Sequence, residues 1–304
     1  MSNEKSLAST NINWYPGHMA KTKRQIIEDL KLIDVVVEIL DARIPLSSQN
    51  PDVKEYTKNK KKVIVLNKAD LADEMETKRW VKYFNNNGIP AVITDSASGK
   101  GVENVIRAIQ NIAKETQDKY ASKGRLGKAI RIMIVGIPNV GKSSFINRIT
   151  KRNTAQVGNK PGVTRQKQWI RIADGTIELM DTPGVLWPKF QTEEIGQHLA
   201  FTGTIKDDIL EKTEIAFQLM KFLINNYINE VVVRYKLNMN SINEIMCRDM
   251  EENDKILEII NTIATKRGAI LAGARIDYEK ISGILLDEFR SGKLGRITIE
   301  KCKE

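Results

Sequence analysis

The chain has 304 residues, of which 41% are hydrophobic and 28% are charged, and its formal net charge at pH 7 is +10. This composition is typical of a soluble globular protein and excludes a disordered polar chain as well as a membrane-embedded one. A chain of this length buries a substantial core, and its length favours about two domains over one.

The sequence carries no targeting or disulfide signal. Residues 1–10 are polar, and no stretch approaches the roughly 18 consecutive apolar residues that a membrane-spanning helix needs. We therefore expect a cytoplasmic protein that does not enter a membrane. The only two cysteines, Cys247 and Cys302, are too few for a disulfide framework and lack the paired spacing of a zinc site.

The positive net charge favours a polyanionic partner, because neutralising phosphate groups releases condensed counterions. Charge alone does not say which polyanion, and an ordinary solvated surface is the alternative for each basic cluster. Lys and Arg residues concentrate in four places, at residues 21–24, 58–62, 123–131 and 151–152.

The first part of the chain alternates strand-like and helix-like patterns, which predicts a parallel α/β sheet. Helical spacing is seen at Trp80, Val81 and Phe84, and again from Val102 to Ile112. Three short β-branched runs read as buried strands, namely Val35–Leu40, Val63–Leu66 and Ala91–Thr94.

A hydrophilic linker, residues 119–128, separates this half from a further strand at Ile130–Val135. The runs Gln168–Ile172 and Thr176–Met180 flank an Asp-Gly turn and predict a hairpin. We therefore expect residues 1–190 to form one α/β domain, in which residues 1–118 and 129–190 are the two halves.

From about residue 191 onward the strand signal disappears, so residues 191–304 are predicted to form a separate all-helical domain. Four helix-like patterns carry this prediction, at Ile205–Tyr227, Ser241–Met250, Asp254–Lys266 and Tyr278–Arg290.

A glycine-rich segment, Gly136–Ser143, fits the phosphate-binding pattern G-x-x-x-x-G-K-[ST] and lies between a predicted strand and a predicted helix. We expect its backbone N–H groups to wrap phosphates, Lys142 to reach the β and γ oxygens, and the Ser143 hydroxyl to bind Mg²⁺. The helix amino terminus adds a favourable field for anions. The predicted phosphate-binding residues are Asn139, Val140, Gly141, Lys142, Ser143 and Ser144.

Two further segments complete a Mg²⁺–triphosphate site. Asp181, directly after a strand, begins a D-x-x-G segment in which the carboxylate holds Mg²⁺ and Gly184 N–H approaches the γ-phosphate. Thr164, in a polar loop, is the candidate second hydroxyl ligand of Mg²⁺, and an ordinary loop threonine is the alternative. The D-x-x-G segment is informative because a phosphate-binding loop precedes it.

The segment Asn67-Lys68-Ala69-Asp70 follows a predicted strand and favours guanine over adenine. The Asp70 carboxylate can accept from guanine N1–H and its 2-amino group, which adenine does not offer, so the wrong base leaves polar groups unpaired. Lys68 can pack its stem over the ring and Asn67 can brace a neighbouring loop. After the next strand, Ser96 and Ala97 are placed so that the Ala97 N–H meets guanine O6.

The order of these motifs is unusual, because the guanine-reading segments precede the phosphate-binding loop. Circular permutation of a Ras-like P-loop GTPase domain explains the order, since every motif still follows its own strand. The loop after Gly184 then leads directly into the helical domain.

These motifs in this order resemble the circularly permuted ribosome biogenesis GTPase A family, also called YlqF. Three further segments carry the resemblance, namely Trp14–Lys21, Asp41–Pro45 and Asp181–Pro188. The family implies a GTP-binding and GTP-hydrolysing assembly factor of the large ribosomal subunit, with rRNA and ribosomal proteins as partners. It also implies a helical domain that contacts RNA.

The resemblance leaves the catalytic group open. Where Ras-like proteins have the Gln that orients the attacking water, this chain has Val185, so another group must act. The family suggests His18, and a structural histidine is the alternative. His198 is predicted to lie on a helix face. Asn139 resembles the asparagine that holds K⁺ in related GTPases, where the cation supplies transition-state charge.

Two features leave alternatives. The guanine loop has Ser98 where GTPases often have Lys, which weakens the expected affinity but not the specificity, because a backbone N–H makes the main contact. For the whole protein, the alternative to an enzyme is an RNA-docking placeholder in which GTP orders switch loops and hydrolysis is incidental. A GTPase that acts on transfer RNA is weaker, because no second catalytic constellation is visible. The oligomeric state is open, and a monomer is expected.

Overall fold

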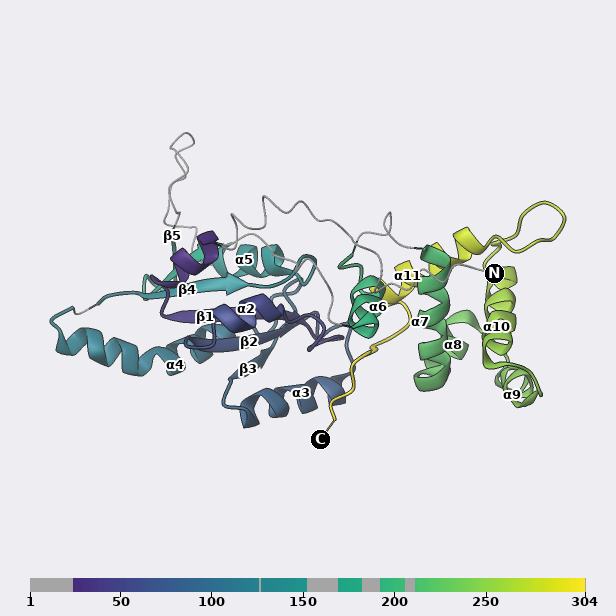
Figure 1. Ribbon diagram of the computed structural model, residues 1–304, viewed down its shortest axis with the longest axis horizontal. Coiled ribbons are helices and arrows are strands. Elements are labelled where there is room, and N and C mark those ends of the chain that lie inside the picture. Colours follow the sequence, from purple (N-terminus) through teal and green to yellow (C-terminus); the bar gives the residue numbers. More distant parts are fainter. Residues whose placement is uncertain (1–23, 126, 152–168, 182–191, 206–210, 304) are drawn as a thin grey trace. The chain divides into compact units, whose positions relative to one another are not determined.

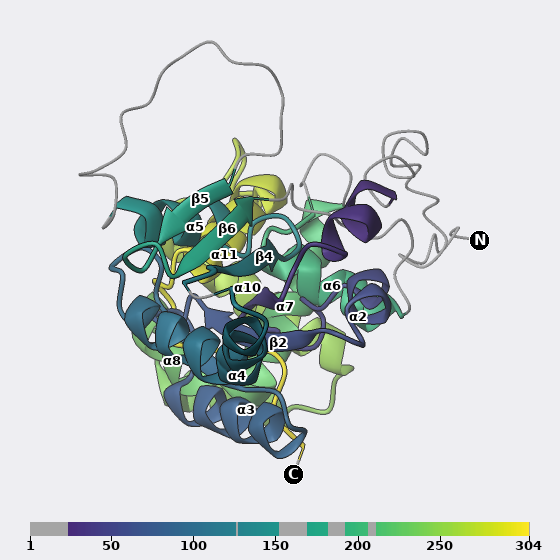
Figure 2. The same ribbon diagram turned by 90° about the vertical axis from the view of Figure 1, so that its left-hand side faces the viewer.

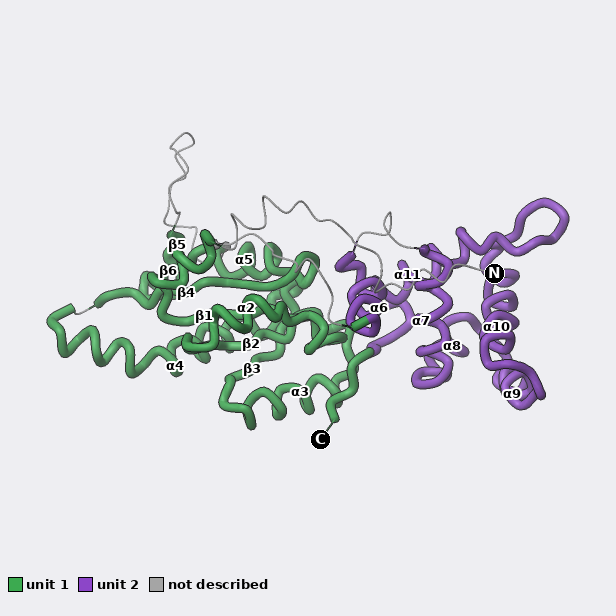
Figure 3. The backbone as a smooth tube through the Cα atoms, in the orientation of Figure 1, with its two compact units in different colours: residues 1–192, 298–304 green, residues 193–297 purple. Residues whose placement is uncertain are grey.

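The computed structural model describes residues 24–125, 127–151, 169–181, 192–205 and 211–303. The chain divides into two compact units, shown in green and purple in Figure 3. Unit 1 comprises residues 1–192 and 298–304, and unit 2 comprises residues 193–297.

Unit 1 is built on a six-stranded sheet (Figure 1), and its strand order is β3-β2-β1-β4-β6-β5, with all six strands labelled in Figure 3. Neighbouring strands pair in parallel except β5, which pairs antiparallel with β6 and forms the predicted hairpin. The strands are β1 (Val35–Asp41), β2 (Lys61–Asn67), β3 (Ala91–Ile93), β4 (Ile130–Val135), β5 (Trp169–Ile172) and β6 (Ile177–Asp181).

Helices cover both faces of this sheet, which explains why all seven residues of β1 are buried. Figure 2 shows α2 on one side of the strands, and α3 with α4 on the other. On the α2 side, Ile26 and Leu30 from the helical residues 24–30 pack with Val36 and Met133. On the α3 side, Trp80 packs with β2 residues. The helices of unit 1 are α2 (Pro51–Tyr56), α3 (Glu74–Asn86), α4 (Val102–Ser122) and α5 (Lys142–Lys151).

Two helices of unit 1 differ from the sequence expectation. Helix α4 continues to Ser122, so the first residues of the predicted linker 119–128 are helical. Its fully buried residues end at Ala113, but Tyr120 in the last turn is half-buried and its hydroxyl donates to Asp34 Oδ1 at 2.6 Å, which holds the end of the helix on the domain. Helix α2 was not predicted because it has only six residues, although Asn50 Oδ1 caps it by accepting from Asp52 N and Pro51 occupies its first turn.

Unit 2 is a bundle of helices, as the loss of strand signal predicted. The predicted helix Tyr278–Arg290 matches α11, and the buried face of α10 carries Ile256, Ile259 and Ile263 at helical spacing. The structure adds α8, which the sequence reading missed. The helices are α6 (Glu193–Phe201), α7 (Lys212–Asn226), α8 (Ile228–Tyr235), α9 (Met239–Cys247), α10 (Glu252–Lys266) and α11 (Tyr278–Arg290).

Two half-exposed arginines pair with the buried carboxylate of Glu288 and join α8, α11 and the end of α10 in unit 2. Arg234 donates to both oxygens of Glu288, at 2.9 and 2.7 Å, and Arg267 donates to the same carboxylate at 2.6 Å. The Arg267 guanidinium also lies over the Tyr235 ring. Burial raises the pKa of Glu288, but these hydrogen bonds and cations outweigh it and lower the pKa from its usual value.

The last residues of the chain return to unit 1, where residues 298–304 form what we call the carboxy-terminal strap. The backbone N–H groups of Ile299 and Glu300 donate to the Arg43 carbonyl at 2.9 and 3.2 Å. Trp80 Nε1 donates to the Glu300 carbonyl at 2.8 Å. The predicted all-helical domain, residues 191–304, therefore extends too far at its carboxyl end, because these backbone groups bond to unit 1.

Within the described ranges, none of the helices is both long and apolar enough to cross a membrane.

Candidate nucleotide-binding site

The predicted nucleotide-binding motifs meet at the carboxyl edge of the sheet. Strand β1 lies between β2 and β4, so the chain segments that follow these strands converge there. Asp41 is paired with Asn67 at the ends of β1 and β2, and Gly136 follows β4. Open α/β sheets bind ligands outside the carboxyl ends of their strands, where strand order reverses. The topology thus places the guanine-reading and phosphate-binding segments side by side.

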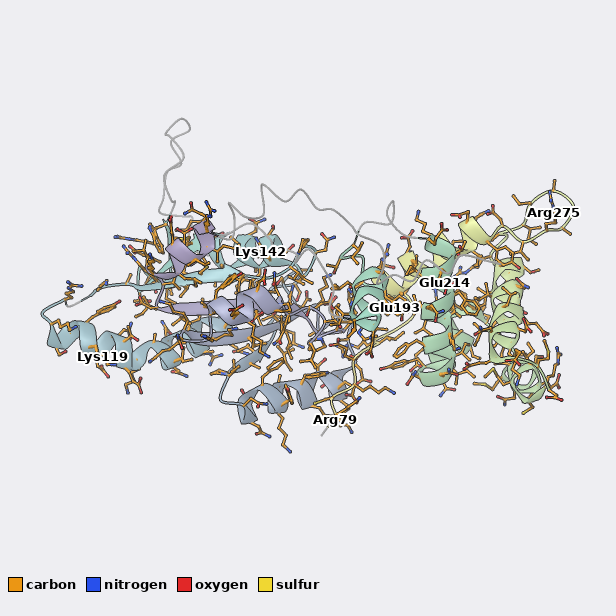
Figure 4. All side chains as sticks on the ribbon, viewed as in Figure 1. Arg79, Lys119, Lys142, Glu193, Glu214 and Arg275 are labelled. Carbon is orange, nitrogen blue, oxygen red and sulfur yellow. The ribbon has the colours of Figure 1, made fainter. Side chains whose placement is uncertain are left out.

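The phosphate-binding loop has the backbone shape that its sequence requires. Asn139 has a positive φ of 63°, which is uncommon for a residue other than glycine, and Gly141 has a φ of 90°. A Cβ on Gly141 would lie 2.3 Å from Asn67 Nδ2, so only glycine fits there. Helix α5 begins at Lys142, labelled in Figure 4, which places the first amides of the helix at its positive end. These features fit an anionic ligand such as a nucleotide phosphate.

Asn67 joins this loop to the guanine-reading segments and is almost fully buried. Its Nδ2 donates to the Val140 carbonyl at 2.7 Å. Its Oδ1 accepts from Thr94 Oγ1 at 3.1 Å, and from the backbone N–H and the hydroxyl of Ser96 at 3.0 and 2.7 Å. These hydrogen bonds agree with the prediction that Asn67 braces a neighbouring loop. They join two loops, the phosphate-binding loop at Val140 and the loop that contains Thr94 and Ser96.

Lys68 adopts a left-handed backbone with φ of 59°. Its ammonium lies 3.1 Å from Asp41 Oδ2, and its side chain is 23% exposed. The salt bridge fixes the head of Lys68, so the side-chain stem is held beside the Asn67 segment. Asp70 is exposed, and the turn that carries it is closed by a Leu71 N–H to Lys68 carbonyl bond of 3.0 Å.

Asp41 is the buried anion of this site. Arg43 Nε and Nη2 donate to its two carboxylate oxygens at 2.9 and 2.8 Å, and the Asp41 backbone N–H donates to Ser48 Oγ at 3.1 Å. Burial alone raises the pKa of Asp41, but the cations of Arg43 and Lys68 outweigh this and hold its pKa far below the usual value. Asp41 therefore stays ionised between two cations.

The Ala97 N–H, which was expected to meet guanine O6, has a partner within its own loop. Ala97 N donates to Asp95 Oδ1 at 2.8 Å, and Ser98 N donates to the same oxygen at 3.2 Å. Recognition of guanine O6 by the Ala97 N–H therefore requires that this hydrogen bond be shared or exchanged. Ser96 is buried, whereas Ala97 and Ser98 are exposed.

Several predicted site residues lie outside the described residues, namely His18, Thr164 and Gly184. Asp181 is the last residue of β6, paired in register with Ile134 of β4. Ser143 and Ser144 are exposed in the first turn of α5. His198 lies on α6 as predicted, with its ring centroid 6.5 Å from that of Phe201, which fits a structural role.

Sequence reasoning missed three contributors to this region. The Asp41–Arg43 pair was noted only as part of a family motif, and its ionic role follows from burial that the sequence does not display. Arg148, on α5, donates to the guanine loop. Glu300, from the carboxy-terminal strap, accepts from Leu46 N and Ser47 N at 2.6 and 2.8 Å. The last contact spans 253 residues, and no local pattern could have revealed it.

The chain is similar to known GTPases over almost its whole length. A family model described as "50S ribosome-binding GTPase" matches residues 131–262, which leaves out the guanine-reading segments, as a permuted order predicts. Ribosome biogenesis GTPase A of Bacillus cereus is 44% identical over 96% of this chain and 95% of its own length. The same-named protein of Bacillus licheniformis is 43% identical over 96% of this chain and 99% of its own length.

The fold comparison agrees. A GDP-bound structure of TM YlqF matches with a TM-score of 0.64 and 24% identity, and the match covers 92% of this chain and 100% of the other. This similarity supports the permuted P-loop fold with its helical unit. The identity to the curated relatives goes further and shows the family. The chain belongs to the ribosome biogenesis GTPase A family and is a GTPase.

Proposed function

We propose that this GTPase binds guanine through Asp70, Lys68 and the Ala97 N–H, with Asn67 as the brace of the site. The observation that carries the proposal is the Asn67 side chain, which bonds to Val140 on one side and to Thr94 and Ser96 on the other. One buried amide thus fixes the spacing between the base-reading loops and the phosphate-binding loop. A guanine nucleotide has its base and phosphates at opposite ends, and it needs both ends held at a fixed distance.

The phosphates and Mg²⁺ bind at the amino terminus of α5. The backbone N–H groups of residues 139–144 and the Lys142 ammonium hold the phosphate oxygens, because a helix amino terminus and a glycine-rich turn favour anions. Ser143, Thr164 and Asp181 are the proposed Mg²⁺ residues, and Gly184 is the proposed γ-phosphate contact. Mg²⁺, when bound, neutralises charge that develops on the phosphate oxygens during hydrolysis.

His18 is the proposed group that orients the attacking water, because Val185 has no polar atom for that role. A neutral imidazole can accept the proton of water or align it. Asn139 is the proposed K⁺ ligand, in a loop position whose positive φ turns the backbone around the phosphates. K⁺ then adds positive charge without an arginine finger.

The partner that we propose is the precursor of the large ribosomal subunit, which the protein binds in its GTP form and leaves after hydrolysis. Three observations support this proposal: the family, the description of the matched family model as ribosome-binding, and the net charge of +10. The helical unit is the proposed RNA-contacting part. The protein acts in the cytoplasm, as a monomer.

The experiment is GTP turnover with Mg²⁺ and K⁺, measured alone and with purified large ribosomal subunits. We expect slow turnover alone and stimulation by the subunits. No stimulation contradicts the ribosomal role. The variant His18→Ala should still bind GTP and the subunit but should fail to hydrolyse and fail to leave. If this variant no longer hydrolyses GTP yet leaves the particle normally, hydrolysis is incidental and the placeholder alternative is supported; if it hydrolyses GTP normally, His18 is not the catalytic group.

A further inference from the structure

Arg148 connects the two halves of the nucleotide site through one rigid helix. It lies on α5, six residues after Lys142, and is half-buried. Its Nε donates to the Ser96 carbonyl at 3.5 Å, and its Nη2 donates to the Ala97 carbonyl. A single helix therefore carries the lysine of the phosphate-binding loop at its start and a guanidinium on the guanine loop in its second turn.

The guanine loop is shaped to admit this side chain. Gly99 has φ of +88°, and a Cβ on Gly99 would lie 3.0 Å from Arg148 Cδ. The loop is closed by Gly99 N donating to the Asp95 carbonyl at 2.8 Å and by Asp95 N donating to the Lys100 carbonyl at 3.0 Å. A larger residue at position 99 would push the arginine stem away, so the loop and the arginine fit as a pair.

The contact with Ser96 bears directly on base recognition. The Ser96 carbonyl and the Ala97 N–H belong to the same peptide group, and in a planar trans peptide they point in opposite directions. A cation that holds the carbonyl from one side therefore aims the N–H to the other side, where it donates to Asp95 Oδ1 in this structure and would be shared with guanine O6. Hydrogen bonds in a chain also polarise one another, so a cation on the carbonyl makes the N–H a stronger donor.

Arg148 also supplies a positive charge to a loop that has Ser98 where many GTPases have lysine. The nearby Asp95 carboxylate accepts the Ala97 and Ser98 N–H bonds. Burial raises the pKa of Asp95, but these hydrogen bonds and the Arg148 cation outweigh it and lower the pKa below its usual value. The carboxylate and the guanidinium thus hold the same two peptide groups from opposite ends: Asp95 accepts from their N–H groups, and Arg148 donates to their carbonyls.

We propose that Arg148 is a positioning residue for recognition of guanine O6, acting through the peptide that joins Ser96 and Ala97. The inference deepens the proposed function, because it rests on guanine binding by the Ala97 N–H. It predicts a specific loss. Without Arg148 the site should keep its reading of the 2-amino group through Asp70 and should lose much of its preference for an oxygen at position 6 of the base.

The test compares three diphosphates by fluorescence competition binding. GDP carries every recognised group, 6-thio-GDP has a weaker acceptor at position 6, and IDP lacks the 2-amino group. For Arg148→Ala we expect GDP affinity to fall by about tenfold, the order expected for a charge-assisted hydrogen bond. The GDP to 6-thio-GDP affinity ratio should fall toward one, and the GDP to IDP ratio should stay at its original value.

Two variants accompany this change. Arg107→Ala removes an arginine from α4 that bonds to Asn104 of its own helix, so it should alter neither ratio. Arg148→Lys keeps the charge but not the fork that reaches two carbonyls, so it should give an intermediate GDP to 6-thio-GDP ratio. If Arg148→Ala does not fold, as judged by circular dichroism, the lysine variant alone carries the test.

The failures of the two proposals are distinguishable. An equal loss for all three ligands, or no loss, makes Arg148 merely structural and overturns the inference. The variant Asp70→Asn tests the base site itself. If it changes base preference while Arg148→Ala leaves the GDP to 6-thio-GDP ratio unchanged, only the inference fails. If Asp70→Asn also leaves base preference unchanged, the proposed guanine site fails as well.

Discussion

The side-chain amide of Asn67 donates to the carbonyl of Val140 at 2.7 Å, across 73 residues of chain. The same side chain accepts three hydrogen bonds from Thr94 and Ser96. In this permuted chain the guanine-reading segment comes before the phosphate-binding loop, which is the reverse of the order in Ras-like GTPases. The two segments are also far apart in the sequence. The contact joins the two segments directly, although the guanine-reading segment precedes the phosphate-binding loop in the chain.

Removing this amide should damage both binding and stability. Asn67→Ala leaves the buried Ser96 and Thr94 hydroxyls and the Val140 carbonyl without their partner, which costs about 1–3 kcal/mol for each unsatisfied group. We expect a loss of unfolding free energy of at least that size, measured by urea titration, and a GDP affinity too weak to saturate. Asn87→Ala is the control, since the Asn87 side chain is exposed and donates to the Tyr83 carbonyl at a helix end. Equal behaviour of the two variants would contradict the bracing role.

Gly141→Ala should abolish nucleotide binding by two effects that a matched variant separates. Gly141 and Gly88 both have positive φ, at 90° and 74°, so alanine strains the backbone at either position. Only at Gly141 does the new Cβ meet a neighbour, Asn67 Nδ2, at 2.3 Å. We expect Gly88→Ala to lose about 1 kcal/mol of stability and to bind GDP normally. Normal GDP binding by Gly141→Ala would show that the loop is not tightly packed on Asn67.

Asp70→Asn should shift base preference from guanine to xanthine. An amide can donate to the carbonyl that xanthine carries where guanine has its 2-amino group, whereas a carboxylate only accepts. Competition of GTP and XTP for the variant and the parent protein gives the answer directly. Preference for GTP in both proteins would remove Asp70 from the site.

The stability that Asp41 contributes should depend on pH. Its folded-state pKa is depressed, so the contribution is fully present above the unfolded pKa of about 4 and is lost as pH falls through the folded pKa. Asp41→Asn should therefore be destabilised relative to the parent protein by a constant amount from pH 7 to pH 5. The difference should shrink at lower pH, as followed by urea unfolding. A difference that grows on acidification would contradict the ionised pair.

The carboxy-terminal strap should stabilise unit 1. Glu300 offers two carboxylate oxygens to the N–H groups of Leu46 and Ser47, and glutamine keeps only one acceptor. Glu300→Gln should lower the unfolding free energy by about 1–3 kcal/mol, read from a shift of the thermal transition. Glu55→Gln, on the exposed side of α2, is the matched control and should leave the transition unchanged. A similar shift for both variants would indicate a general charge effect.

Much of this architecture follows from local patterns, because each motif sits directly after a run of buried β-branched residues. Val63–Leu66 before Asn67 and Ile130–Val135 before Gly136 predict both the strands and the edge where the motifs meet. Helix α11 has the predicted bounds, because its apolar residues recur at helical spacing; the structure adds that the Asp277 side chain caps it by accepting from Lys280 N. These predictions succeed because the strands, the helix and the motifs depend on residues close together in the sequence.

The parts that sequence reasoning missed depend on contacts between distant segments. The ionic role of Arg43 requires its burial against Asp41, and charged residues in a loop usually face solvent. The strap was assigned to the helical domain because nothing local in residues 298–304 indicates that Thr298 and Glu300 bond to unit 1. Arg148 fits an ordinary amphipathic helix surface until the position of the Ser96–Gly99 loop is known.

The central claim is that distant segments form one pocket that grips the phosphates with Gly136–Ser143 and reads the base with Asn67–Asp70. Titration of a fluorescent, non-hydrolysable GTP analogue in Mg²⁺ buffer, with GDP and ATP as competitors, tests it most directly. We expect saturable one-site binding that GDP displaces and ATP does not. Absence of saturable binding to folded protein, or equal displacement by ATP, would contradict the claim.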